Sequence, residues 1–223
     1  MTVIEPSRVD LEHLPHTKKY SASLRFWHWA SAIVITGSLL TVLINSTILQ
    51  GWNTANVIKD QLHHSGVTVT DDQARSASHA LRDNVWDIHK YFGFVLAALI
   101  LFRLIAEFFH LADQKLINKI RRAYHEYQSG KNRLIARHEL VVKTLYATLY
   151  VLLIIMAVTG LCLAFEDDVP ALKAIHAIRE IHSFCMYLIL AFIFVHLAGV
   201  FLAERKDSKG IVSDMINGGQ MPE

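Results

Sequence analysis

Three long stretches of the chain contain no Asp, Glu, Lys or Arg. They have 33, 22 and 23 residues, and lie between Arg25 and Lys59, between Lys143 and Glu166, and between Glu180 and Glu204. A helix crosses the hydrocarbon core of a bilayer with about 20 mostly apolar residues. Each stretch is therefore long enough for one transmembrane helix, and the chain is predicted to be an all-α membrane protein.

A fourth apolar region, residues 85–109, is interrupted by charged residues near its two ends. Its uncharged centre, residues 91–102, is too short to span a bilayer alone. We therefore interpret the whole region as one transmembrane helix that contains functional polar side chains. The prediction is a four-transmembrane-helix bundle with helices near 24–48, 85–109, 141–165 and 179–203. A segment 1–23 precedes this membrane domain of residues 24–203, and a tail of residues 204–223 follows it.

The loops differ in charge, and this difference predicts the orientation. Residues 110–140 hold seven Lys and Arg residues, whereas residues 49–84 hold three against four Asp, and residues 166–178 are acidic. Because basic loops stay on the cytoplasmic side, both termini and the middle loop are predicted to be cytoplasmic, in a bacterial inner membrane. The net charge of only +2 argues against nucleic acid as a partner, and two cysteines exclude a disulfide framework or a multi-cysteine metal site.

Four histidines fall inside the predicted spans: His28, His89, His182 and His196. An ionisable side chain within a membrane is costly and usually functional. By depth the four form two pairs, with His28 and His196 toward the cytoplasm, and His89 and His182 toward the outside. Any one of them alone could equally be a packing residue, but four at matched depths indicate ligands.

The interval between His182 and His196 supports this interpretation. Fourteen residues are about 40° short of four helical turns and rise roughly 21 Å, so both imidazoles face one side of the helix. This suits two stacked planar cofactors with two axial histidines each, and haem iron takes such ligands. The chain has no CxxCH, so two non-covalent haem b groups are predicted, with the four histidines as iron ligands.

Two arginines and two glycines lie on the faces of these histidines. Arg25 precedes His28 by three residues, and Arg103 follows His89 by fourteen. Either could pair with a propionate of the inner haem, although Arg25 could equally be an interfacial residue. Gly93 and Gly199 follow His89 and His196 by four and three residues, and could let a flat ring approach the backbone. Tighter helix packing is the other reading of both glycines.

Several motifs resemble the bacterial di-haem cytochrome b family, which includes the membrane subunits of nickel–iron hydrogenases, formate dehydrogenase gamma subunits and stand-alone quinone-linked cytochromes b. The similar segments are the R-x-x-H-W sequence at residues 25–29, residues 87–93 with Arg103, and the two histidines of the fourth span. The tail, residues 209–219, resembles the S-x-M-[VI]-N-G ending of the hydrogenase cytochromes.

The resemblance implies an electron-transfer and quinone-reducing subunit. A periplasmic partner, the small subunit of a nickel–iron hydrogenase or another redox protein, would deliver electrons to the outer haem, and quinone would accept them beyond the inner haem. Two alternatives stay open: a stand-alone oxidoreductase that passes electrons from a small donor such as superoxide to quinone, and a haem-free transporter of metal or protons. No motif marks a catalytic residue or the quinone site.

Overall fold

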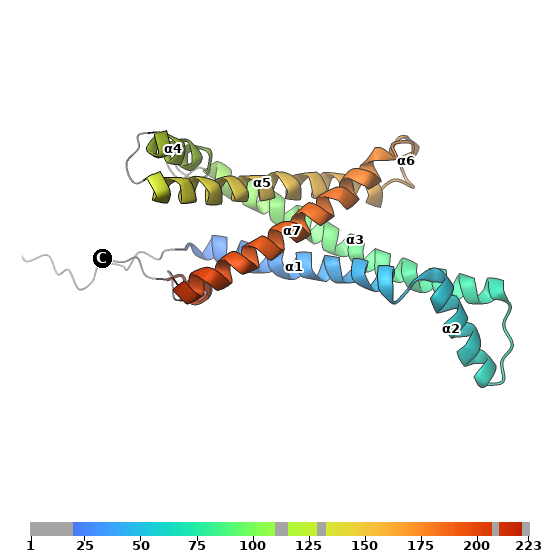
Figure 1. Cartoon of the computed structure of the whole chain (residues 1–223). Helices are drawn as coiled ribbons and strands as arrows, with labels where there is room; N and C mark the ends of the chain where they lie inside the picture. The colour runs from blue at the N-terminus through green and yellow to red at the C-terminus, as the bar shows by residue number, and fades with distance from the viewer. Residues whose placement is uncertain (1–19, 110–115, 129–132, 207–209, 220–223) are drawn as a thin grey trace, which may run out of the picture. The chain divides into compact units, whose positions relative to one another are not determined.

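The structure, a computed structural model, describes residues 20–109, 116–128, 133–206 and 210–219. Within these ranges every regular element is a helix, as Figure 1 shows. The helices are α1 (Ala22–Thr47), α2 (Gly51–His64), α3 (Asp71–Phe109), α4 (Leu116–Gln128), α5 (Arg133–Ala164), α6 (Pro170–Lys173), α7 (Ala177–Lys206) and α8 (Ile211–Asn217). Of the predicted segment 1–23, only residues 20–23 belong to the described part of the chain.

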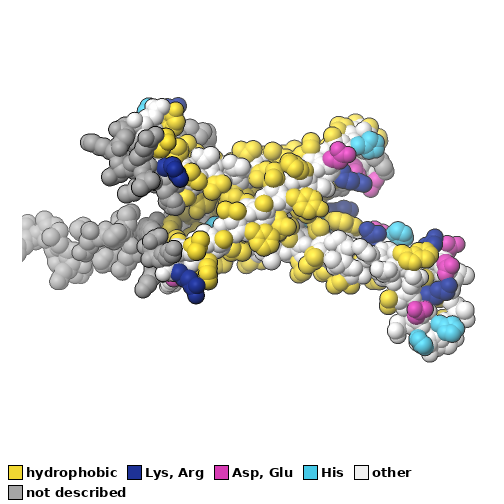
Figure 2. All heavy atoms as spheres, viewed as in Figure 1, with side chains coloured by type: hydrophobic (Ala, Val, Ile, Leu, Met, Phe, Trp, Pro, Cys, Tyr) yellow, Lys and Arg dark blue, Asp and Glu magenta, His cyan; other side chains and the backbone are white. Residues whose placement is uncertain are grey.

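Four helices are long and apolar enough to cross a membrane. Their candidate spans are Ala22–Thr47, Asp71–Glu107, Leu140–Ala164 and Ala177–Arg205. Large hydrophobic side chains such as Phe184, Phe194 and Phe201 are more than half exposed along them, and Figure 2 shows hydrophobic side chains over the long helices. Lipid is the solvent that such surfaces require. The prediction of an all-α membrane protein with four candidate transmembrane helices is therefore confirmed.

The chain divides into two compact units. One contains residues 1–28 and 196–223, and the other contains residues 29–195. The larger unit is built from helices that pack in pairs: α2 on α3, α3 on α5 and α4 on α5. Its most buried side chains include Leu153 on α5 and Cys185 and Ile189 on α7.

Residues 49–84, which we expected to be a loop, form two helical segments instead. Helix α3 begins at Asp71, fourteen residues before the predicted start of its span, and α2 packs against it. Thr70 and Gln73 cap α3 reciprocally: the backbone N–H of Thr70 donates to Gln73 Oε1 (2.9 Å), and that of Gln73 donates to Thr70 Oγ1 (3.3 Å). This capping box satisfies backbone donors that a helix start leaves unpaired, and it explains the early beginning.

Small side chains allow α2 and the beginning of α3 to pack closely. Ala55, Ala74 and Ser78 are at most 5% exposed, and the Ser78 hydroxyl donates to the Gly51 carbonyl (3.2 Å). An ion pair between Lys59 and Asp71 joins the same two helices. We call residues 51–84 the hairpin. Charged and histidine side chains cover part of its surface in Figure 2.

The second correction concerns the middle loop and the tail, which also contain helices. Residues 116–128 of the predicted loop form α4, and residues 211–217 of the tail form α8. Gly210 precedes α8 with a φ of +91°, a conformation that side chains other than glycine rarely adopt. The Glu204 carboxylate accepts the Gly210 N–H (2.7 Å) and so ties the start of α8 to the end of α7.

Candidate functional site

The larger unit brings the imidazole rings of His89 on α3 and His182 on α7 next to each other in an edge-on arrangement. Their ring centres are 6.4 Å apart, and the ring planes are inclined by 78°. Both side chains are half-buried, and the indole of Trp86 lies edge-on to the His89 ring at 5.3 Å. The sequence analysis paired these two histidines by their predicted depth in the membrane, and in the structure they are neighbours.

A threonine hydroxyl contacts the Nδ1 atom of each of these rings. Thr41 Oγ1 lies 2.9 Å from His89 Nδ1, and Thr159 Oγ1 lies 2.9 Å from His182 Nδ1. Both hydroxyls already donate to carbonyls of their own helices, Thr41 to Ser38 O (2.6 Å) and Thr159 to Ile155 O (2.7 Å). Because each hydroxyl proton is used there, each hydroxyl accepts from the ring N–H at Nδ1.

The Ser38 carbonyl settles the tautomer of His89 independently. It lies 3.3 Å from His89 Nδ1, and a carbonyl oxygen can only accept a hydrogen bond. Nδ1 therefore carries the proton, and Nε2 keeps the lone pair that a metal needs. The threonines were not among the predicted site residues. The signal available in the sequence was a hydroxyl residue inside an apolar span. In the structure Thr41 and Thr159 are at most 9% exposed.

The smaller unit contains the other pair, His28 of α1 and His196 of α7. Their ring centres are 6.2 Å apart, with planes inclined by 66°, and both side chains are half-buried. The sequence analysis paired these two residues by their predicted depth in the membrane. The structure brings the same two residues together.

Glycines near the histidines differ in what surrounds them. A Cβ atom on Gly160 would lie 3.1 Å from Cε1 of His182, so this glycine gives the ring its space. A Cβ atom on Gly93 or Gly199, the two predicted positions, would meet no atom within 4 Å. A flat ring can approach the backbone at such positions, so the role proposed for these two glycines stays a prediction. Gly37 is a packing glycine, because a Cβ there would collide with the Phe92 ring.

Arg25, a predicted propionate partner, contacts the tail within its own unit. Its Nη1 donates to the Ile216 carbonyl at the end of α8, and the Tyr20 N–H donates to the Gly218 carbonyl beside it (3.0 Å). The start of α1 is thus joined to the tail by two hydrogen bonds. The Arg25 Nε is buried without a protein acceptor, so the guanidinium still has a donor for a propionate.

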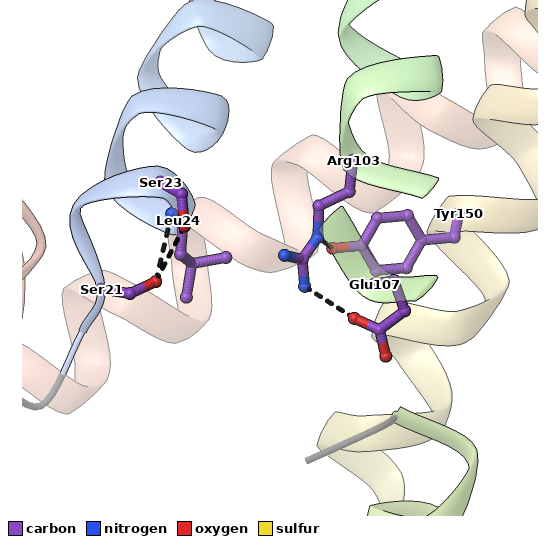
Figure 3. Close-up of polar contacts among 6 residues, drawn as sticks. All are labelled: Ser21, Ser23, Leu24, Arg103, Glu107 and Tyr150. Carbon is purple, nitrogen blue, oxygen red and sulfur yellow. Dashed lines mark hydrogen bonds and ion pairs between the residues drawn. The ribbon is translucent and has the colours of Figure 1, made fainter. Parts of the chain in front are cut away.

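Arg103, the other predicted propionate partner, lies between Glu107 and Tyr150. Figure 3 shows its Nη2 near Glu107 Oε2 (3.3 Å), and its Nε donating to the Tyr150 hydroxyl (3.0 Å). Its side chain is 16% exposed. The glutamate one turn along α3 therefore compensates the arginine charge within the span. Figure 3 also draws Ser21, whose hydroxyl accepts the Leu24 N–H at the start of α1.

Comparison with protein families identifies the family of the chain. The family described as prokaryotic cytochrome b561 matches residues 19–218. The chain belongs to the prokaryotic cytochrome b561 family. It is a multi-pass membrane cytochrome b that binds haem b and takes part in electron transfer. Neither a search of curated proteins nor a search of solved structures found a match.

The histidine pairs fit the haem of a cytochrome b561. An imidazole nitrogen about 2.0 Å from a metal places its ring centre roughly 3.1 Å from that metal, so two axial imidazoles have centres roughly 6.2 Å apart. The observed separations are 6.2 and 6.4 Å. Among the described residues, no three His, Cys, Asp or Glu side chains gather to hold a metal. Paired histidines suit haem, because the porphyrin supplies the remaining iron ligands.

Proposed function

We propose that this cytochrome b561 binds two haem b groups and carries electrons from a periplasmic nickel–iron hydrogenase to the quinone pool of a bacterial inner membrane. One haem would lie between His89 and His182, and the other between His28 and His196. The observation that carries the proposal is the presence of two separate pairs of neighbouring imidazoles, whose ring centres are 6.2 and 6.4 Å apart. Haem b, when bound, supplies a reversible one-electron carrier at each pair.

The surrounding residues support two non-equivalent sites. At the His89–His182 pair, Thr41 and Thr159 hold both Nδ1 protons, which orients both Nε2 atoms. At the other pair, Arg25 lies one turn from His28 and offers a cationic group to a propionate. Such differences give the two carriers different potentials.

The direction of electron flow rests on the charge of the loops. Helix α4 and the start of α5 belong to the basic loop, which the positive-inside rule assigns to the cytoplasm. The hairpin would then face the periplasm, and electrons would enter from the same side, next to His89. The quinone would bind near the other pair. These assignments, including cytoplasmic termini, are part of the proposal.

The donor is proposed from chemistry and from the tail. Two cysteines cannot build the nickel–iron centre or the iron–sulfur relay of a hydrogen-activating enzyme, so a partner must supply the electrons. The tail that resembles hydrogenase cytochromes forms α8, and Arg25 and Glu204 hold it in place. These hydrogen bonds support a structural role for the tail in this chain.

The proposal is tested with tagged chain purified in mild detergent together with its partners. We expect mass spectrometry to identify hydrogenase large and small subunits, hydrogen to reduce the haem α-band, and added quinone to reoxidise it. The His182→Ala variant should lose this response, whereas Thr148→Val, which changes an exposed hydroxyl on α5, should keep it. Recovery of the haem-loaded chain alone would contradict the hydrogenase donor. Reduction by superoxide would then favour the stand-alone enzyme.

A further inference from the structure

Helix α4 carries its polar side chains on one face. Asn118, Arg121, Arg122 and His125 follow one another at positions i, i+3, i+4 and i+7, which is the spacing of a single helical face. All four are exposed. Together they line an open hollow of about 320 Å³. We call these four residues the basic face.

The opposite side of α4 packs on the protein. Ile120 and Tyr127 lie seven residues apart, on the side away from the basic face, and both are half-buried. Helix α4 packs along α5, beside the beginning of that helix in Figure 1. Tyr124 lies at the edge between the two sides, 48% exposed, and its hydroxyl accepts a hydrogen bond from Gln128 (2.9 Å). A helix of this kind, apolar on one side and basic on the other, is typical of a membrane surface.

Arg121 and Arg122 carry the charge of the basic face. Among the side chains that the structure describes, no carboxylate forms an ion pair with either of them. The whole loop of residues 110–140 holds seven Lys and Arg against Asp113, Glu126 and Glu139. An anion is therefore the ligand that this surface attracts.

The position of α4 identifies the anion. The third span begins at Leu140, whereas α5 begins at Arg133, so about two turns of α5 extend beyond the span. Helix α4 lies between the end of α3 and this extension in sequence and packs on α5. The anions concentrated at that level are phospholipid phosphates. Guanidinium groups bind phosphate oxygens through two parallel hydrogen bonds, and two adjacent arginines can hold one phosphate from both sides.

We propose that the basic face of α4 binds the phosphate headgroup of an anionic phospholipid. Arg121 and Arg122 provide the charge, and Asn118 and His125 line the same hollow beside them. The apolar side and Tyr124 keep the helix at the level of the headgroups. The binding site does not depend on the haem sites or on which leaflet the loop faces.

Native mass spectrometry of the haem-loaded full chain in detergent tests this site, with phosphatidylglycerol and phosphatidylcholine as the added lipids. We expect the wild-type chain to retain phosphatidylglycerol in preference. Each arginine near an anionic surface contributes about fivefold in affinity, so the double variant Arg121→Gln/Arg122→Gln should bind phosphatidylglycerol about thirtyfold more weakly. Binding of phosphatidylcholine should not change.

The matched control is Arg179→Gln, which removes an exposed arginine at the start of α7 that pairs with Glu166. It should leave the lipid preference intact. Equal retention of both lipids by the wild-type chain, or unchanged phosphatidylglycerol affinity in the double variant, would overturn the proposal. Displacement of the lipid by an equal concentration of inorganic phosphate would also overturn it, because the ligand would then be a free phosphate compound.

The proposal remains testable if the double variant loses its haem. The single variants Arg121→Gln and Arg122→Gln then decide, each with an expected loss of about fivefold. The variant Arg121→Lys/Arg122→Lys keeps the charge and should lose less than the double glutamine variant. Wild-type affinity in both single glutamine variants would reject the site.

Discussion

The Thr159 hydroxyl lies 2.9 Å from Nδ1 of His182 while it donates its own proton to the Ile155 carbonyl at 2.7 Å. This arrangement leaves the hydroxyl only one role toward the ring, that of acceptor. Thr41 has the same relationship to His89 from another helix. The two threonines thus fix the proton on Nδ1 of His89 and His182, and Nε2 is the nitrogen that each ring leaves available to a metal.

Replacing either threonine by valine should raise the potential of one haem. An acceptor at Nδ1 increases the basicity of the ligand, which stabilises ferric iron, and valine keeps the shape without the acceptor. We expect Thr159→Val and Thr41→Val to shift the midpoint potential of the haem at the His89–His182 site upward in a redox titration, and to weaken haem retention about 10- to 100-fold. Thr148→Val, on the same helix as Thr159, is the control. An unchanged potential in both variants would show that the hydroxyls do not tune the ligands.

Each histidine pair should lose its haem independently of the other. His28→Ala and His196→Ala should each remove one haem and leave the spectrum of the other, because the two pairs lie in different compact units. His89→Ala and His182→Ala should remove the complementary haem. The measurement is the pyridine haemochrome content of the purified variants, with circular dichroism to check the helical fold. Loss of both haems from a well-folded single variant would contradict the pairing.

Removing only one partner of the Arg103–Glu107 ion pair should lower the stability of the protein more than removing both. Arg103→Gln removes the charge-assisted hydrogen bond between Arg103 and the Glu107 carboxylate, and such a bond contributes about 1.5–3 kcal/mol. We expect a lower thermal stability for this variant and recovery in Arg103→Gln/Glu107→Gln. If Arg103 also pairs with a propionate, the double variant will still lower the potential of the inner haem, because a cation near the iron favours the reduced state.

Tyr150→Phe separates these two roles of Arg103. It removes only the phenol that accepts from Arg103 Nε, so it should leave both potentials unchanged. Inner-haem potentials that are equal in the wild type, the double variant and Tyr150→Phe would restrict Arg103 to compensating Glu107.

The local stability of the hairpin should depend on the capping box at the start of α3. Thr70→Ala removes the hydroxyl that accepts the Gln73 N–H and should cost about 1 kcal/mol locally. The expected result is faster proteolysis within residues 65–71, with no change in haem content. Thr68→Ala, two residues earlier in the same connection, is the matched control. Identical cleavage rates for Thr70→Ala and the wild type would contradict the capping role.

Sequence predicted the spans and the partners within each histidine pair. Uncharged runs such as residues 144–165 have one physical explanation, a bilayer core, and a histidine near the end of a span has a depth that follows from its position. His28 and His196 could therefore be matched although 167 residues separate them.

The short amphipathic helices and the contacts of the histidine rings were harder to predict. Helix α4 and the hairpin are polar enough to resemble loops, although the Thr70–Gln73 capping box and the spacing of the basic face were readable signals. The hydroxyl contacts of Thr41 and Thr159 depend on how α1 and α5 approach other helices, and no local pattern encodes this approach. The clearance beside the His182 ring at Gly160 depends on the same approach of helices, and the role expected of Gly93 and Gly199 stays a prediction.

The number of haem groups per chain tests the central claim most directly. Purified full-length protein should contain two haem b per chain by pyridine haemochrome and protein quantitation, and a redox titration of the α-band should resolve two one-electron steps. One haem per chain, with a single step that only one of the two histidine pairs affects, would contradict the account.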